Sequence, residues 1–481
     1  KEDGIDTILT CDNGIAAADQ IRLANSYGMT VIVTDHHEVP YEEQGGKRIY
    51  RLPEAIAVID PKQEDCPYPY KQICGAVVAY KLIQYLLREA QASGWIGQDG
   101  EPVSRGASQD LLQELLSFTA LATVCDVMEL RDENRILVRE GLKEMAKTTN
   151  YGLKALLQIN DLYGKLLSPY HAGFVIGPCL NATGRLDTAK RTLELFDAPT
   201  LQEAAMIAAD LKSMNESRKQ MTEDGVKLAA QQVEQELSGD DILVVYLPDC
   251  HESLAGIIAG RIREKYHKPV FVLTSAEEGV KGSGRSIEAY SMYEEMNKVK
   301  ELFARFGGHR QAAGLTLAAE DGFSNEQLAD RFRRALNANS TLTSEDFEEV
   351  VHIDVPLPLQ LADRKFLTEL EKLEPFGTGN PKPLFARKQI SILSMAKLGK
   401  TGKYRRIRIA DEQGRNYQAV YFGDGDEMDR HLMQKYGEER FMQSCRGGLM
   451  QGQMEISMVY SPQINSYNGR ESIQILIQYY R

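Results

Sequence analysis

Short apolar runs and one amphipathic stretch alternate along the first 60 residues of the chain. The runs at residues 6–12 (DTILTCD) and 29–35 (MTVIVTD) are rich in β-branched residues, whereas residues 15–28 (IAAADQIRLANSYG) have helical spacing and end at a glycine. A third apolar run, AIAVID, ends at Asp60. This order of strand, helix and strand predicts a βαβ unit with parallel strands.

The later chain divides into a helical stretch, a second α/β unit and a β-rich region. Helical patterns dominate from residue 70, and the polar-amphipathic run at 201–237 predicts either a helix that connects two lobes or an ordinary surface helix. The strand–helix–strand order then returns in DILVVYL, LAGIIAGRIREKY and PVFVLT, and the short strands after it predict a small β-barrel or sandwich. We therefore expect an α/β protein divided at residues 1–200, 201–237, 238–345 and 346–481.

The amino-acid composition indicates the cellular compartment of the protein more than it indicates what the protein binds. The seven cysteines are scattered and none form a CxxC pair, which favours reduced thiols over a disulfide framework or a zinc–thiolate site. No apolar stretch approaches the roughly 20 residues that span a bilayer, and no signal-peptide pattern is visible. These features predict a cytoplasmic protein with no membrane partner. The net charge of −13 does not exclude nucleic acid, because a ligand meets the local field rather than the global sum.

Polar side chains follow the first two predicted strands at the point where each strand ends. Asp12 ends the first strand, and Asp35, His36 and His37 end the second. Ligands gather at the carboxyl ends of parallel strands, so these side chains should share one rim. Carboxylates with neutral imidazole suit Mn²⁺ or Mg²⁺ better than a thiolate-binding metal. A second interpretation stays open, in which Asp12 caps the helix that begins near Gly14 and the histidines belong to a polar loop.

A further acid follows the apolar helical run LLSFTALATV. Asp126 is flanked by apolar residues in TVCDVMEL, and burying an isolated acid is costly unless it is paired or bound to a metal. Asp126 is therefore either a third ligand or a helix-end acid that pairs with Arg131 or Arg135.

Two glycine-rich segments of the second α/β unit have the composition of phosphate-binding turns. In KGSGRS, glycine would let backbone N–H groups approach an anion, and the arginine would add a phosphate fork. In FGGHR, which follows a predicted helix, the glycines would form a similar nest below an imidazole. A histidine before another helix would either line the same cleft or cap that helix, and each glycine segment has the alternative of a cap or a tight turn. The candidates are Ser283, Arg285, Ser286, Gly308, His309 and His251.

The β-rich region contains six basic residues and no acid between residues 397 and 408. Strand alternation puts Tyr404, Arg406 and Arg408 on one face and Arg405 on the other. An aromatic ring among cations suits base stacking beside a phosphate track. The alternative is a solvated strand edge protected by its charge. Two tyrosines on the next strand are expected to extend the binding face, Tyr417 and Tyr421.

Six short segments, taken together in their order and spacing, resemble the DHH phosphoesterase superfamily: CDNGI, TDHHE, TVCDVMEL, IGPCLNATGRLDTA, KGSGRS and FGGHRQAAG. Within it they resemble the bacterial RecJ family of single-strand-specific 5′→3′ exonucleases, as does LEPFGTGNPKPLF in the β-rich region. The resemblance covers the chain from Thr10 to its end. It implies a parallel-sheet DHH domain, a smaller α/β DHHA1 domain and an OB-fold barrel, and it implies hydrolysis of single-stranded DNA in repair and recombination.

The resemblance also implies roles for the residues at the strand ends. Asp12 would bridge two divalent cations, Mn²⁺ or Mg²⁺, and His36 and Asp126 would complete the shell of the second. Asp35 would orient a histidine, and His37 would face the substrate phosphate. Two cations of this kind stabilise both the attacking and the leaving oxygen of an in-line displacement.

Substrate contacts are implied outside the metal centre as well. In GPCLNATGR, Asn181 and Arg185 would be substrate-facing loop residues, against the alternative of a plain turn with a surface arginine. Cys179 stands where the family often has an arginine, which would remove one phosphate contact. The family pattern makes Ser283, Arg285 and His309 holders of phosphates near the 5′ end, and it favours strand binding by the barrel.

One departure from the family pattern concerns its first motif, an Asp-x-Asp pair that is absent from the chain. Those carboxylates should complete the shell of the first metal, so we expect weak or no metal-dependent hydrolysis from this chain alone. Strong Mn²⁺-dependent nuclease activity would contradict that expectation. The implied partner is single-stranded DNA, with a single-strand-binding protein and a helicase as candidates, and we expect a monomer.

Two other functions stay open. One is a small-substrate DHH phosphoesterase that acts on pyrophosphate, short oligoribonucleotides or cyclic dinucleotides, which would not need a basic β-rich domain. The other is a non-catalytic DNA-binding member of the superfamily, which the intact acids and histidines at the strand ends disfavour.

Overall fold

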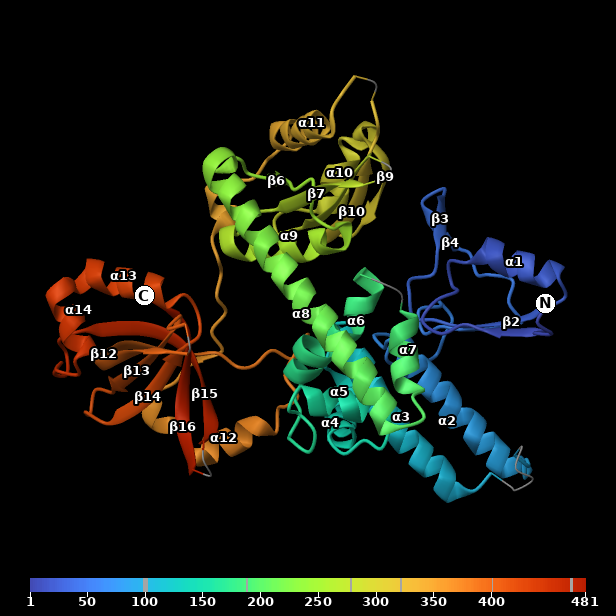
Figure 1. The fold of residues 1–481 in the computed structure, drawn as a ribbon, viewed down its shortest axis with the longest axis horizontal. Helices are drawn as coiled ribbons and strands as arrows, with labels where there is room; N and C mark the ends of the chain where they lie inside the picture. Colours follow the sequence, from blue (N-terminus) through green and yellow to red (C-terminus); the bar gives the residue numbers. More distant parts are fainter. Residues whose placement is uncertain (98–102, 187–188, 277–278, 321, 400, 468–469) are drawn as a thin grey trace. The chain divides into compact units, whose positions relative to one another are not determined.

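The computed structural model describes the 481-residue chain except residues 98–102, 187–188, 277–278, 321, 400 and 468–469 (Figure 1). The chain forms two compact units. The first unit comprises Lys1–Glu144 and Val351–Arg481, and the second comprises Met145–Val350. Each unit has sheets of its own.

A three-stranded parallel sheet lies in the amino-terminal part of the first unit. Its strands, in spatial order, are β1 (Thr7–Leu9), β2 (Thr30–Thr34) and β5 (Ala57–Ile59). Helix α1 (Ala18–Ser26) connects the first two strands, and its Ile21 packs with Val31 and Val33 of β2 in one apolar cluster. The parallel βαβ unit predicted from the apolar pattern is confirmed.

A hairpin that the apolar pattern did not predict follows β2. All of its strand residues are exposed, so no alternation of hydrophobic and polar positions marks it. Its turn residues Gly45 and Gly46 have φ of 60° and 79°, the left-handed region that the two-residue hairpin turn requires. In the sequence, only the Gly45–Gly46 pair indicates this hairpin turn. The strands are β3 (Tyr41–Gln44) and β4 (Lys47–Tyr50).

Three helices complete the amino-terminal part of the first unit. Helices α2 and α3 pack against each other, and Ser104 caps α3 by accepting a hydrogen bond from the N–H of Ala107 at 3.1 Å. Gly75, the first residue of α2, lies against Asp12, and Asp126, the residue after α3, lies beside His36, so both are at the carboxyl ends of the strands. The helices are α2 (Gly75–Ser93), α3 (Arg105–Cys125) and α4 (Asp132–Met145).

The carboxy-terminal part of the first unit is a closed barrel. Strand β12 pairs with β13 on one side and with β15 on the other, which closes the ring. Fully buried residues such as Ile392, Ile407 and Ile409 fill the interior, so of the two predicted alternatives the barrel is confirmed. Its elements are β11 (Val355–Pro356), α12 (Arg364–Glu371), β12 (Phe385–Leu398), β13 (Tyr404–Ala410), β14 (Asn416–Tyr421), α13 (Gly425–Tyr436), α14 (Glu438–Cys445), β15 (Glu455–Tyr467) and β16 (Arg470–Tyr480).

The second unit begins with helices and is spanned by the long helix α8 (Figure 1). Thr200 caps α8 by accepting a hydrogen bond from the N–H of Glu203 at 3.2 Å. Helix α8 packs against α5, α6 and α7 and also against α9, so it ties the helical part of this unit to its sheet. The helices are α5 (Tyr151–Ile159), the π-helical turn His171–Ile176, α6 (Gly177–Leu186), α7 (Lys190–Phe196), α8 (Leu201–Gln232) and the π-helical turn Val233–Leu237.

A mixed five-stranded sheet in the order β6-β7-β8-β10-β9 forms the rest of the second unit. Strands β6 and β7 are parallel, as the strand–helix–strand pattern predicted, and the other neighbours are antiparallel. The elements are β6 (Leu243–Tyr246), α9 (Ala255–Tyr266), β7 (Val270–Ala276), β8 (Gly279–Arg285), α10 (Met292–Asn297), β9 (Phe303–Gly308), β10 (Ala312–Leu317) and α11 (Asn325–Ala338). The 3₁₀ turns of the chain are Glu252–Leu254, Lys300–Leu302, Ser344–Phe347 and Leu359–Leu361.

The described helices are either too short or too polar to cross a bilayer, so none of them is a candidate membrane span.

Candidate metal centre

Asp12 stands at the carboxyl end of β1 in an unusual backbone conformation. Its φ is 63°, and its N–H donates to the carbonyl of Thr34 at 3.1 Å. Helix α1 begins six residues later, after Ala17 and without a side-chain cap. The alternative in which Asp12 caps that helix is therefore wrong. Instead, Asp12 lies against Gly75, the first residue of α2, where an added Cβ would come within 2.4 Å of Asp12 Oδ1.

Asp35 is a buried carboxylate that the backbone holds in place. Its Oδ2 accepts the N–H of Ile15 at 2.9 Å, and its Oδ1 accepts the N–H of His36 at 2.8 Å. Oδ1 is also hydrogen-bonded to the Nδ1 of His37 at 2.7 Å. Burial alone would raise the pKa of Asp35, but these hydrogen bonds outweigh it and the pKa lies below its usual range. Asp35 is thus a fixed anion that orients the ring of His37.

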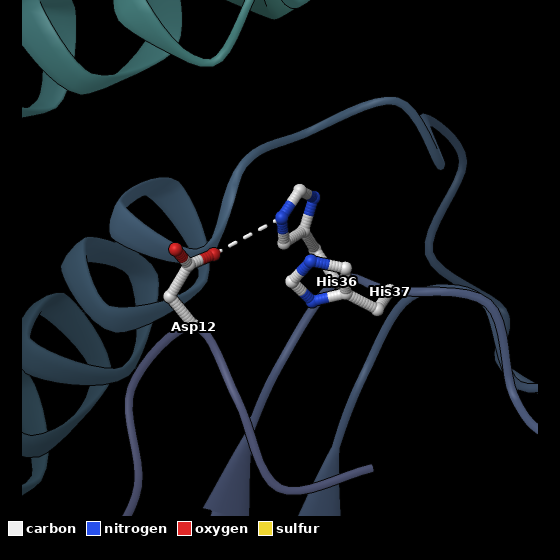
Figure 2. A group of neighbouring side chains, drawn as sticks. All are labelled: Asp12, His36 and His37. Atoms are coloured by element: carbon white, nitrogen blue, oxygen red, sulfur yellow. Dashed lines mark ion pairs between the residues drawn. The ribbon is translucent and has the colours of Figure 1, made fainter. Parts of the chain in front are cut away.

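His36 directs its Nε2 between two carboxylates. This nitrogen lies 3.0 Å from Asp12 Oδ1 and 3.5 Å from Asp126 Oδ2. Figure 2 draws the ion pair between His36 and Asp12. The residue is buried, with 8% of its surface exposed, and no described residue offers its Nε2 a partner with hydrogen-bonding geometry. A buried polar atom without a partner is costly, and two carboxylate oxygens beside an imidazole nitrogen form a donor set that Mn²⁺ or Mg²⁺ accepts. These residues therefore fit a divalent cation.

Asp126 reaches the same place from the end of α3. It is the residue after the helix, and burial is the main cause that raises its pKa. Within the described part of the chain no ion pair joins it to an arginine, because Arg131 and Arg135 donate instead to the carbonyls of Gly379 and Lys372, each at 2.6 Å. The pairing predicted as an alternative is therefore wrong.

His37 is the exposed member of the histidine pair. Its ring centroid lies 4.5 Å from that of His36, and the hydrogen bond that its Nδ1 donates to Asp35 raises the pKa of its imidazole. The ligand atoms of Asp12, His36 and His37 lie within 4.8 Å of one another (Figure 2). The geometry thus offers His37 as well as Asp126 as a neighbour of the candidate ion.

Asp60, at the end of β5, is a further acid on this rim that the sequence interpretation did not weigh. It is 2% exposed, burial raises its pKa, and its Oδ2 has no partner in the described structure. Its Oδ1 accepts the N–H of Lys62 at 2.8 Å. The strand-end rule that singled out Asp12 and Asp35 would also have found Asp60, since it closes the third apolar run.

The segment around Asn181 is helical rather than a loop, which corrects the prediction. Ile176, Cys179 and Ala182 are buried at helical spacing, and this periodicity carries the π-helical turn straight into α6. Asn181 is exposed on that helix. Cys179 is interior, with its Sγ 3.5 Å from Asn215 Nδ2 on α8, so this position does not face solvent. The side chain of Arg185 lies outside the described part of the structure.

The segment KGSGRS is also not a turn, because residues 281–285 belong to strand β8. An added Cβ at Gly282 would come within 2.3 Å of Leu273 Cδ2, and one at Gly284 within 2.7 Å of Met292 Sδ. Glycine is required at both positions because the neighbouring side chains leave no room for a Cβ. The same sequence pattern would arise from a phosphate-binding turn, so the sequence alone does not distinguish the two. Ser286 is buried and donates its hydroxyl to the carbonyl of Tyr290 at 2.5 Å.

The remaining candidates of the second unit lie in two places. His309 follows strand β9 rather than a helix, and its N–H donates to the carbonyl of Ala312 at 2.8 Å, so Gly308 and His309 form a β-hairpin end. An added Cβ at Gly256, in the first turn of α9, would lie 2.9 Å from Arg285 Nη2 and 3.5 Å from Ser283 Cβ. His251 caps the 3₁₀ turn that leads into the same helix, as one of its two alternatives predicted.

The basic strand β13 alternates as predicted. Tyr404, Arg406 and Arg408 point away from the core, whereas Arg405 is buried with its guanidinium between Asp426 and Asp429, each at 2.6 Å. Tyr417 and Tyr421 pair with Ile409 and Arg405 and pack on the barrel core. They therefore lie on the inner face, and the prediction that they extend the binding face is wrong. Lys400, one of the six basic residues, lies outside the described residues.

Three family models match successive parts of the chain. Residues 3–122 match the amino-terminal domain of the DHH family, residues 239–339 match the DHHA1 domain, and residues 353–479 match the RecJ OB domain.

Known proteins resemble the chain over almost its whole length. It is 30% identical to the single-stranded-DNA-specific exonuclease RecJ of Bacillus subtilis, covering 99% of this chain and 54% of that protein. It is 32% identical to the RecJ of Salmonella typhimurium, covering 99% of this chain and 77% of that protein. The crystal structure of RecJ from Thermus thermophilus in complex with Mn²⁺ matches with a TM-score of 0.73 and 26% identity, covering 99% of this chain and 62% of that chain.

Proposed function

The chain belongs to the RecJ family of single-stranded-DNA-specific exonucleases, and we propose on this premise that it serves the hydrolysis of phosphodiester bonds in single-stranded DNA from the 5′ end. The observation that carries the proposal is the buried Nε2 of His36, which lies between Asp12 and Asp126 and has no hydrogen-bond partner among the described residues. The chain spans 54% of the length of its Bacillus subtilis relative. A cytoplasmic monomer that acts beside a helicase and a single-strand-binding protein is the cellular setting that the proposal implies.

In this proposal Asp12, His36 and Asp126 hold the divalent cation. A bound cation would polarise the scissile phosphate and activate a water molecule. Asp35 keeps the ring of His37 oriented through its Nδ1, so the Nε2 of His37 remains available to donate to a phosphate oxygen. The Mn²⁺ in the Thermus thermophilus structure supports Mn²⁺ as the ion to test first, with Mg²⁺ as the second.

Two surfaces support single-stranded DNA as the substrate. Arg406 and Arg408 are exposed beside Tyr404 on one barrel strand, where cations and an aromatic ring suit a phosphate track and base stacking. In the second unit, Arg285 lies against the first turn of α9, where backbone N–H groups and an arginine favour a phosphate. We propose that His309, Asn181 and Arg185 contribute further contacts.

The proposal is tested by substrate competition. A long single strand, the matching duplex and a dinucleotide are incubated with excess protein and Mn²⁺, and the products are resolved on a sequencing gel. Because the Asp-x-Asp pair is absent from this chain, we expect slow release of 5′ mononucleotides, from the single strand in preference to the other two substrates. Faster cleavage of the dinucleotide would favour a small-substrate phosphoesterase. Absence of all cleavage would show that hydrolysis needs the missing carboxylates, and it would favour a strand-binding member of the superfamily only if Mn²⁺ also fails to bind at Asp12, His36 and Asp126.

Replacing His37 with asparagine separates its proposed phosphate contact from a role as a metal ligand. Asparagine cannot take the charge of an imidazolium, so we expect His37→Asn to bind single-stranded DNA more weakly. Its Mn²⁺ affinity should stay within about threefold of that of the unsubstituted protein. Loss of a true metal ligand would cost more than that, since even the loss of an outer partner typically costs about 10–100-fold. Electron paramagnetic resonance of free Mn²⁺ measures the Mn²⁺ affinity. If His37→Asn loses as much Mn²⁺ affinity as His36→Ala, His37 is itself a ligand.

Replacing both Arg406 and Arg408 with alanine tests the barrel face. Each phosphate contact on a single strand contributes about 0.7 to the slope of log K against log salt, so the double variant should lower that slope by about 1.4 and weaken binding at low salt. Arg430→Ala, an exposed arginine on α13 of the same barrel, is the matched control and should leave the slope unchanged. Fluorescence anisotropy at several salt concentrations measures the affinity for single-stranded DNA and its salt dependence in both variants. An equal effect of the control would assign the binding to general surface charge.

A further inference from the structure

The turn that follows Asp126 has a strained backbone. Val127 has a φ of 56° and Asp132, the first residue of α4, has a φ of 42°. A residue other than glycine in the left-handed region costs on the order of 1 kcal/mol or more, and such a conformation persists only where its surroundings fix it. The position of Asp126 therefore depends on what holds residues 127–132.

On one side, the turn is held by its own domain. The N–H of Met128 donates to the carbonyl of Thr123 at 3.1 Å. Asn134 is fully buried, and its Nδ2 donates to the carbonyls of Glu129 at 3.0 Å and Gln72 at 2.6 Å. Asn134 thus links the turn to the segment that enters α2.

On the other side, the turn is held by Lys372–Asn380, the segment between α12 and β12 of the barrel. The N–H of Leu130 donates to the carbonyl of Thr378 at 2.7 Å, and the Nε of Arg131 donates to the carbonyl of Gly379 at 2.6 Å. The approach is close, because an added Cβ at Gly379 would lie 2.9 Å from the Cβ of Glu129. These partners are separated by about 250 residues of sequence, as the 248-residue separation of Arg131 and Gly379 illustrates.

The segment Lys372–Asn380 is itself fixed by internal hydrogen bonds. Gly377 and Asn380 exchange two backbone hydrogen bonds, of 2.9 and 3.1 Å. The Nδ2 of Asn380 donates to the carbonyls of Leu373 and Pro375, each at 2.9 Å. The carbonyls of Thr378 and Gly379 are therefore held in place for the turn after Asp126.

We propose that the segment Lys372–Asn380 positions Asp126 for the metal ion, with Gly379 and Arg131 as positioning residues. The barrel then has two tasks, since its entry segment fixes one side of the metal centre and its strand β13 offers a face for DNA. The inference rests on the proposed function, in which Asp126 is a ligand. Asp12 and His36 stand at the ends of strands on the sheet side, and among the described residues neither of them is hydrogen-bonded to this segment.

The test is the substitution Gly379→Ala. The new methyl group meets the Cβ of Glu129 and displaces the turn, and we expect the Mn²⁺ affinity to fall about tenfold, the lower end of what loss of an outer positioning partner costs. The matched control is Gly414→Ala in the same barrel. Gly414 has a φ of 77° against 71° for Gly379, so both variants carry the same backbone penalty, but a Cβ at Gly414 meets only the flexible Gln451 side chain, at 3.4 Å. The control should bind Mn²⁺ like the unsubstituted protein.

Two further variants test the proposal even if Gly379→Ala does not fold. Arg131→Ala removes one hydrogen bond without a clash and should lower the Mn²⁺ affinity by a smaller factor in the same direction, whether or not Gly379→Ala folds. Asp126→Ala reports on the ligand itself. Circular dichroism confirms folding, and electron paramagnetic resonance of free Mn²⁺ gives the affinities.

The outcomes separate the inference from the proposed function. The inference is overturned if Asp126→Ala weakens Mn²⁺ binding while Gly379→Ala and Arg131→Ala, both folded, bind as the unsubstituted protein does. It is also overturned if Gly414→Ala loses as much affinity as Gly379→Ala, because backbone strain alone would then account for the loss. If Asp126→Ala itself leaves Mn²⁺ binding unchanged, the metal assignment in the proposed function is overturned with it.

Discussion

Replacing His36 with alanine is expected to weaken Mn²⁺ binding by more than about 100-fold, the upper end of the cost of losing an outer partner. The reason is that the Nε2 of His36 is the one buried nitrogen on which Asp12 and Asp126 converge, at 3.0 and 3.5 Å. Without it, two half-exposed carboxylates remain, and these hold a divalent ion weakly. Titration of free Mn²⁺ followed by electron paramagnetic resonance measures the loss.

The matched control for this variant is His431→Ala in the barrel. The Nε2 of His431 is also buried and has no hydrogen-bond partner in the part of the chain that the structure describes, and its ring lies edge-on to Tyr480. Any loss that follows from removing a buried imidazole alone would appear in both variants. We expect His431→Ala to retain full Mn²⁺ affinity, and equal losses in the two variants would refute the assignment of His36.

The second large effect is expected at Arg405, which stabilises the barrel rather than binding DNA. Its side chain is 2% exposed, and its Nη2 lies 2.6 Å from both Asp426 Oδ1 and Asp429 Oδ2. The hydrogen bond with Asp429 is the main cause that raises the pKa of Arg405, so the guanidinium is charged throughout. The side chain of Asp426 is exposed, but that of Asp429 is only 14% exposed. Removing Arg405 leaves the Asp429 carboxylate without its partner in a largely buried position, so Arg405→Ala should destabilise the barrel by about 3–5 kcal/mol.

The neighbouring residue provides the control for this prediction. Arg406 lies on the same strand with its side chain exposed, so Arg406→Ala should change the barrel stability by less than about 0.5 kcal/mol. Hydrogen exchange of barrel amides, followed by mass spectrometry, reads the free energy of opening for this domain alone. Similar protection in the two variants would mean that the buried ion pair contributes little.

The sequence pattern predicted the features that depend on periodicity. The parallel sheet follows from apolar runs that end in acids, and the shared rim of Asp12 and His36 follows from the carboxyl-end rule for such sheets. Strand alternation correctly predicts which side chains of β13 face the barrel core, including that of Arg405. These predictions held because burial imposes a period of two or 3.6 residues on the chain.

The features that depend on packing between distant segments could not be read from the sequence. The glycines of KGSGRS look like a phosphate turn by composition, yet they exist because Leu273 and Met292 leave no room for a Cβ. The sequence does not show the register of Tyr417 and Tyr421 against β13, and that register places them on the inner face. The contact between Arg131 and Gly379 joins two segments that only the folded chain brings together.

Anomalous diffraction from a crystal of this protein that contains Mn²⁺ tests the metal site directly. We expect a peak within about 2.2 Å of His36 Nε2 and of one carboxylate oxygen each from Asp12 and Asp126, the distances at which small divalent cations are bound. A peak that is absent from this position, or one that is held by His37 with Asp126 turned away, would contradict this expectation.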